Sequence, residues 1–145
     1  MTTLPLTRCR EILVEVAVGH LGAIVADVPD VFPVFFVLWG DRVAFRTPPG
    51  PELDAILESP EVCLTATVFD EVIGEWEAVT VWGTATVVTE AAVAAEVAGL
   101  FMEKYRALDW QIPEMLPGEV VVVLPIERLA GLRSGQGLRR LRGAG

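Results

Sequence analysis

The sequence predicts a mainly β fold in which six antiparallel strands form a small barrel with peripheral helices. Three short apolar runs follow one another closely, at residues 20–26, 31–38 and 43–47. The connections between them are too short for parallel crossovers, which need a dozen residues or more, so these strands are expected to pair as an antiparallel meander. Hydrophobic residues make up 52% of the 145 residues, which is enough for the core of one domain.

A helix is expected just before this meander. Thr7 stands at the position of an N-cap, and Ile12, Leu13 and Val16 follow at the spacing of an apolar helical stripe. Glycine is favoured just past the end of a helix, so Gly19 is expected to end this one.

The second part of the chain alternates helices with strands. Three prolines and a glycine at residues 48–51 form a rigid corner. The elements expected after it are helices at residues 52–58 and 91–105 and strands at residues 62–68, 76–88 and 119–126, the second strand being bent at Gly83.

Some of the predicted strands are apolar on both faces, as in residues 34–38 and 120–124. Both faces of such strands must be covered, and the helices can cover only one side. The sequence therefore predicts a homodimer, in which a second copy covers the other side.

Charge is distributed unevenly along the chain. All 20 acidic residues but only six of the 11 basic residues precede residue 128, so residues 1–127 carry a charge of −14. Such an acidic body repels a phosphate backbone, which argues against nucleic acid as a partner. Residues 1–133 are interpreted as one domain and residues 134–145 as a basic, flexible tail, with an anion-binding arm as the alternative interpretation of the tail.

Several classes of function are excluded by what the sequence lacks. No apolar stretch is long enough for a membrane span and no leader pattern opens the chain, so a cytoplasmic protein without a membrane partner is expected. A single histidine, His20, and two isolated cysteines predict neither a metal site nor a disulfide scaffold. The chain contains no phosphate-binding P-loop, dinucleotide fingerprint or nucleophile elbow.

One pair of residues is a candidate for ligand binding. Arg46 and Thr47 end a predicted strand and lead through the corner into a helix start. A guanidinium, a hydroxyl and the free N–H groups of a helix start could together hold a phosphate. From these residues alone, the simpler interpretation is a surface arginine paired with one of the many carboxylates.

Longer stretches of the chain resemble a known family. They include GDRVAFRT at residues 40–47 and VWGTA at residues 81–85, together with residues 19–25, 31–37, 50–56, 60–63, 74–76 and 120–131. In their order these stretches resemble the pyridoxamine 5′-phosphate oxidase-like, FMN-binding split-barrel proteins, over residues 8–133.

The resemblance implies a six-stranded split barrel that forms a homodimer and holds FMN, or in some members F420 or haem, in a groove between subunits. It implies that Arg46 and Thr47 hold the flavin phosphate. It further implies that the segment Phe32-Pro33-Val34-Phe35 lines the flavin ring.

The chain departs from the family pattern at three positions. Glu52 stands where the family carries a lysine or arginine that assists the phosphate, and like charges at close range repel. Phe35 stands where flavin-binding relatives often carry asparagine, and Glu77 where they often carry a small hydroxyl residue. These departures keep the fold and weaken the grip on a phosphate.

Other candidate site residues each have two interpretations. Trp76 and Trp110 could stack on a flavin or an apolar substrate, or pack in the core. His20 could be an axial haem ligand or a structural residue. Glu75 and Glu77 share one face of a strand, where they could act as an acid/base pair or simply face solvent.

The resemblance therefore implies a flavin-dependent oxidoreductase that binds FMN and acts on a small organic substrate, with no catalytic residue assigned. The alternative is a split-barrel protein without flavin, whose apolar groove binds or transforms a hydrophobic small molecule.

Overall fold

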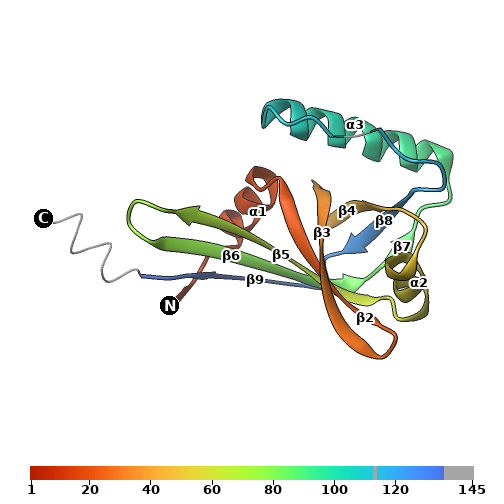
Figure 1. Ribbon diagram of the computed structural model, residues 1–145. Helices are drawn as coiled ribbons and strands as arrows, with labels where there is room; N and C mark the ends of the chain where they lie inside the picture. The colour runs from red at the N-terminus through yellow and green to blue at the C-terminus, as the bar shows by residue number, and fades with distance from the viewer. Residues whose placement is uncertain (113, 136–145) are drawn as a thin grey trace, which may run out of the picture.

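The computed structural model describes residues 1–112 and 114–135 (Figure 1). The helices are α1 (Leu6–Glu15), α2 (Pro51–Glu58) and α3 (Ala91–Ala107). The strands are β1 (Thr2–Thr3), β2 (Val18–Val25), β3 (Val28–Trp39), β4 (Arg42–Thr47), β5 (Glu61–Asp70), β6 (Glu75–Thr84), β7 (Thr86–Val87), β8 (Val120–Pro125) and β9 (Arg128–Arg133). Most of the tail predicted at residues 134–145 lies outside the described residues.

The described strands form one antiparallel sheet in the order β1-β9-β6-β5-β2-β3-β4-β8-β7. The 12-residue strand β3 joins its two halves, because residues 28–35 pair with β2 and residues 36–39 pair with β4. The sheet closes where β6 continues into β7, which pairs with β8. At this seam a Cβ on Gly83 would collide with the carbonyl oxygen of Pro125, so only glycine allows β6 and β8 to approach this closely.

The six predicted strands are confirmed as β2, β3, β4, β5, β6 and β8, but the prediction of six strands in all is wrong. Within the described residues the sheet has nine. The extra strands β1 and β7 have two residues each, and β9 follows β8 after a short turn. The predicted strand at residues 76–88 is interrupted at Ala85, two residues beyond the expected bend, where the Ala85 N–H bonds the Pro60 carbonyl.

The first helix differs from its predicted limits. Pro5 occupies the N-cap position and no side chain caps the helix, so Thr7 is not the N-cap. The helix ends at Glu15, where Val16 takes up an extended backbone. Gly19 lies beyond it, in β2 opposite Val34 of β3. Gly19 is buried there, and an added Cβ would lie 3.1 Å from the ring of Phe36. Strand pairing and close packing therefore explain this glycine better than a helix end does.

Two hydrophobic clusters pack against the two faces of the sheet. The larger cluster fills the barrel and includes Phe36, Phe45, Leu64 and Val81. The smaller cluster lies between α3 and the opposite face of β3, β4 and β8, and α3 covers this face in Figure 1. The long β5–β6 hairpin and β9 extend away from α3, toward the N-terminus. No helix among the described residues has the length and hydropathy needed to cross a lipid bilayer.

Helix α3 also binds the backbone of β3. The phenol of Tyr105 accepts the Phe36 N–H at 3.0 Å and lies 2.6 Å from the Ala17 carbonyl oxygen. The Nζ of Lys104 donates to the carbonyl oxygens of Phe36 at 2.9 Å and Leu13 at 3.2 Å. These bonds satisfy both backbone groups of Phe36, the residue at which pairing with β2 has ended.

We expect the stability of this arrangement to depend on pH. Burial lowers the pKa of Lys104 from 10.5 to about 7, so between these values the unfolded chain binds more protons than the folded chain. The free energy of unfolding should therefore rise as the pH increases from 7 to 9. Urea denaturation across this range should show the rise in the native protein and a flatter profile in the Lys104→Met variant. An equal slope in both proteins would contradict the assignment to Lys104.

Candidate functional site

The side chain of Arg46 lies in a largely buried ion pair. Its Nε donates to Oε1 of Glu119 at 3.1 Å, and the two side chains are only 10% and 9% exposed. The second carboxylate oxygen of Glu119 accepts the Leu116 N–H at 2.7 Å. The positive charge of Arg46 is thus compensated by a carboxylate of this chain, as the simpler interpretation of the sequence expects. Its expected surface location is wrong, because the pair is largely buried.

Thr47 does not join Arg46 in a common binding site. Consecutive residues of a strand point to opposite faces, and Thr47 is buried at 2% exposure on the face away from Arg46. Its hydroxyl makes a long hydrogen bond, 3.4 Å, to the Pro48 carbonyl. Within one chain, the guanidinium of Arg46 and the hydroxyl of Thr47 are therefore not brought together to bind one phosphate.

The corner after β4 offers few hydrogen-bond donors to an anion. Pro48, Pro49 and Pro51 have no N–H group. The carboxylate of Glu52 lies beside Gly50, with Oε2 3.7 Å from the point where a Cβ of residue 50 would be. Glu52 and Asp54 both fall in the first turn of α2, so the positive end of the helix dipole already faces carboxylates.

The predicted ring-lining segment is divided between the two faces of β3. Phe32 and Val34 contact the barrel core, Pro33 is exposed, and Phe35 packs under α3. The ring of Phe35 makes an edge contact with Trp110, with centroids 6.3 Å apart. Of the predicted aromatic residues, Phe35 and Trp110 are therefore the two that the structure brings together.

An aromatic row connects these residues to Arg46. Phe35 meets Tyr105 edge-on at 5.4 Å, Tyr105 stacks on Phe101 at 6.0 Å, and the Arg46 guanidinium lies 5.8 Å from the Phe101 ring. Two cavities border this row, of about 440 and 350 Å³. Both are lined by Met102 and Ile112, and Arg46 lines the smaller one.

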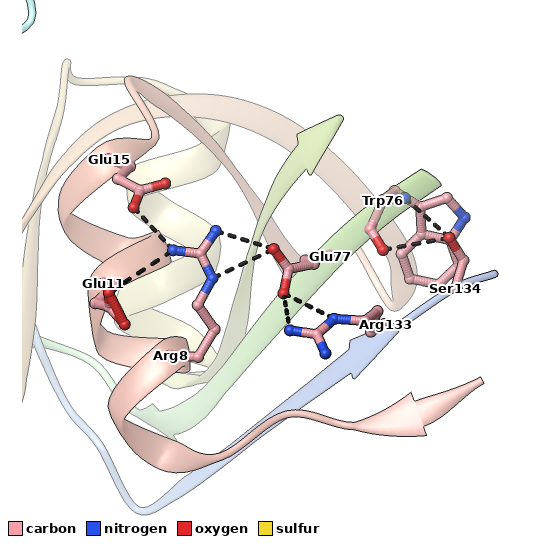
Figure 2. Close-up of polar contacts among 7 residues, drawn as sticks. All are labelled: Arg8, Glu11, Glu15, Trp76, Glu77, Arg133 and Ser134. Atoms are coloured by element: carbon pink, nitrogen blue, oxygen red, sulfur yellow. Dashed lines mark hydrogen bonds and ion pairs between the residues drawn. The ribbon is translucent and has the colours of Figure 1, made fainter. Parts of the chain in front are cut away.

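Trp76 lies elsewhere, on β6. The Ser134 hydroxyl accepts the Trp76 N–H at 2.9 Å and donates to the Trp76 carbonyl at 3.3 Å (Figure 2). The Trp76 carbonyl also accepts the Ser134 N–H at 3.0 Å. Trp76 borders a third cavity, of about 370 Å³, that includes Arg8 and Phe69 and shares no residue with the cavity at Trp110. Trp76 and Trp110 therefore do not line one groove within a single chain.

The neighbouring Glu77 links three elements. Arg8 of α1 donates to Oε1 at 2.9 Å and Arg133 of β9 donates to Oε2 at 2.9 Å, as Figure 2 shows. Burial alone would raise the pKa of Glu77, but the hydrogen bonds from the two arginines outweigh it and hold this pKa below 4.5. Both carboxylate oxygens of Glu77 are therefore occupied, which does not suit the role of an acid/base partner for Glu75.

The remaining candidate is His20. His20 lies exposed on β2, opposite Pro33 of β3 and Thr65 of β5. Within the described residues, no three His, Cys, Asp or Glu side chains are grouped so as to hold a metal ion.

Sequence reasoning did not identify Lys104, Tyr105 or Glu119 as important residues. A signal for Lys104 was present, because it falls on the same helical stripe as Val97 and Phe101, where an apolar residue is expected. Glu119 gave no such signal, since its partner lies 73 residues away in the sequence.

Comparison with known proteins agrees with this architecture. A family described as pyridoxamine 5′-phosphate oxidase matches residues 6–133. The chain belongs to this family. A comparison with curated proteins found no match.

Solved structures share the split-barrel fold of the family. An FAD-binding protein from Mesorhizobium loti is 19% identical with a TM-score of 0.76, the match covering 92% of this chain and 98% of that one. The FAD-binding protein from Mycobacterium smegmatis is 25% identical with a TM-score of 0.71, covering 92% and 100%. The flavocytochrome Anf3 from Azotobacter vinelandii is 24% identical with a TM-score of 0.72, covering 90% and 68%.

The ion pair at Arg46 generates a prediction about stability. Arg46→Met should lower the free energy of unfolding by about 3 kcal/mol, because it leaves the buried Glu119 carboxylate without its arginine. The double variant Arg46→Met/Glu119→Gln should recover much of this loss, since no buried charge is then left unpaired. Urea denaturation measures both, and equal losses in the single and double variants would contradict the coupling.

Glu77 generates a prediction about acid stability. Its lowered pKa means that its contribution is complete above pH 4.5 and is lost as the pH falls through the folded-state pKa. The native protein should therefore lose stability below pH 4.5 more steeply than the Glu77→Gln variant does. Glu15→Gln, which removes a more exposed partner of Arg8, is the matched control and should keep the native profile. A native profile in Glu77→Gln would refute the assignment.

Proposed function

We propose that this protein binds a flavin and uses it to oxidise or reduce a small organic molecule. The observation that carries the proposal is the match of residues 6–133 to the pyridoxamine 5′-phosphate oxidase family. Two solved structures described as FAD-binding proteins support it, because the match covers 98% and 100% of their length. This chain therefore retains the complete fold of proteins that hold a flavin, and the cofactor would supply the redox chemistry.

The proposed position of the flavin ring is beside the aromatic row under α3. Tyr105 and Trp110 line a cavity of about 440 Å³, and Phe35 contacts both rings. Tyr105 is buried, whereas Trp110 is 49% exposed. An exposed aromatic side chain at the edge of a cavity, here Trp110, is suited to stacking on a planar ligand. FMN remains the flavin that the sequence resemblance favours, and FAD is the flavin named for the neighbours.

The proposal includes a homodimer. Ile24, Val28 and Val31 on the β2–β3 hairpin are 41%, 60% and 65% exposed. Apolar side chains gathered on one hairpin favour coverage by a second copy of the chain.

A second candidate function is the binding of a hydrophobic small molecule without flavin. It is favoured by the two carboxylates at the expected phosphate site, Glu119 on Arg46 and Glu52 at the start of α2. The cavities beside the aromatic row would then hold an apolar ligand.

Gel filtration distinguishes the two candidates. The purified protein is incubated separately with riboflavin, FMN and FAD, and the visible flavin absorbance of the protein peak is then measured. We expect flavin to co-elute with the protein, and Trp110→Ala to reduce the amount retained. Protein that retains none of the three flavins would refute the proposal and leave the second candidate.

A further inference from the structure

We propose that a cavity formed by the β2–β3 hairpin together with β5 and β6 binds a small apolar molecule that carries a protonated amine. This cavity has a volume of about 480 Å³, which is larger than either cavity beside the aromatic row. None of the described residues that line it belongs to those two cavities. The inference therefore concerns a second site and does not depend on flavin binding.

A glycine in β2 contributes to the shape of this cavity. Gly22 pairs with Val31 of β3 on one side and with Cys63 of β5 on the other. Leu21 lies in the barrel core, so Gly22 faces the opposite side of the sheet. A Cβ on Gly22 would lie 2.9 Å from the Cys63 Sγ, which shows that the thiol lies over the glycine, where both residues line the cavity.

The sides of the cavity suit the hydrocarbon part of a ligand. Ile24 and Val31 line it from the β2–β3 hairpin, and Trp82 lines it from β6, with β5 and β2 between them in the sheet. Ile24 and Val31 are 41% and 65% exposed. An apolar ligand in this place would remove exposed hydrocarbon from water, which favours binding.

The charge of the lining determines which kind of apolar molecule fits. Among the described residues that line the cavity, the charged ones are all acidic: Asp30, Glu61 and Glu127. The carboxylate of Glu127 accepts a hydrogen bond from the Thr84 hydroxyl at 3.0 Å, which holds it in place. A protonated amine complements these carboxylates, whereas an anion of the same shape would be repelled by them.

A positive group of the protein already occupies the rim of this cavity. The Arg128 guanidinium lies over the Trp82 ring, 3.9 Å from its centroid. The face of a tryptophan ring attracts cations, so this contact is an independent sign that positive charge is favoured there. With Arg128 counted, three carboxylates still surround one cation. The cavity can therefore accept a further positive charge.

The test measures how strongly small molecules protect Cys63 from a thiol reagent. Cys63 lines the cavity and is partly exposed, whereas Cys9 is buried and serves as the internal control. The full-length protein is treated with iodoacetamide, and the labelling rate of each cysteine is followed by mass spectrometry of its peptides. Three probes with the same ring are compared: phenethylamine, phenethyl alcohol and hydrocinnamate. N-acetylcysteine, labelled in parallel, corrects for any effect of a probe on the reagent.

We expect phenethylamine to protect Cys63 at a concentration about threefold to fivefold lower than phenethyl alcohol, the factor that a partly exposed ion pair contributes. Hydrocinnamate should protect least, and added salt should reduce the difference between amine and alcohol. Equal protection by amine and alcohol would overturn the inference. It would also be overturned if no probe protects Cys63, or if Cys63 does not react even without a probe, since the cavity would then be empty or closed.

Matched variants identify the carboxylates responsible. Glu61→Gln and Glu127→Gln each remove one charge from the cavity and keep an oxygen that accepts hydrogen bonds. Each should lower the advantage of the amine over the alcohol about twofold. Glu103→Gln removes the same charge from α3, outside this cavity, and should keep the native preference. Circular dichroism confirms that the variants fold.

The control variant separates the cavity from the charge of the whole protein. If Glu103→Gln lowers the advantage of the amine as much as the two cavity variants do, the net negative charge attracts the amine, and the inference fails. Because both probes are compared within the same variant, a change in the intrinsic reactivity of Cys63 cancels in the ratio.

Discussion

The passage of β3 from one half of the sheet to the other is the constraint on which the rest of the structure depends. At Phe36 the strand has left β2, so its N–H and carbonyl on that side need other partners. Tyr105 and Lys104 of α3 supply them. Lys104 also bonds to Leu13 of α1, and Tyr105 bonds to Ala17 just after this helix, so the same two side chains of α3 connect α1 to β3. The helix thereby acts in place of a neighbouring strand. Its position over β3, β4 and β8 also forms the aromatic row and the two cavities beside it.

The main strands could be predicted because their signals are local. Turn residues and short connections identify a meander, and the two-residue turn at Ala26 and Asp27 has the positive φ angles typical of a tight hairpin. Elements that depend on distant pairing could not be predicted in this way. The strands β1 and β7 have two residues each and exist only because β9 and β8 lie beside them. Gly19 was misread for the same reason, since its role is set by the ring of Phe36 packed against it.

The candidate site was less predictable, for two physical reasons. Arg46 and Thr47 are adjacent in sequence, but the twofold period of a strand directs them to opposite faces, a consequence that the sequence alone already contained. The partner of Arg46 is different in kind, because Glu119 is one of 20 acidic residues and only the fold selects it. Trp76 and Trp110 were grouped by residue type, whereas the sheet places them beside separate cavities.

Glu119 and Glu52 are present for different physical reasons, and these decide how freely each position can change. Arg46 is nearly buried, and a buried guanidinium is stable only beside an anion, so Glu119 has a structural reason to be there whatever the protein binds. Glu52 is only partly buried in the first turn of a short helix, and the stabilisation expected from a carboxylate in that place is a few tenths of a kcal/mol to about 1 kcal/mol. A lysine would therefore cost the fold little at position 52. The charge at position 52 is accordingly one that the fold leaves free to vary, whereas the charge at Glu119 contributes to the stability of the barrel.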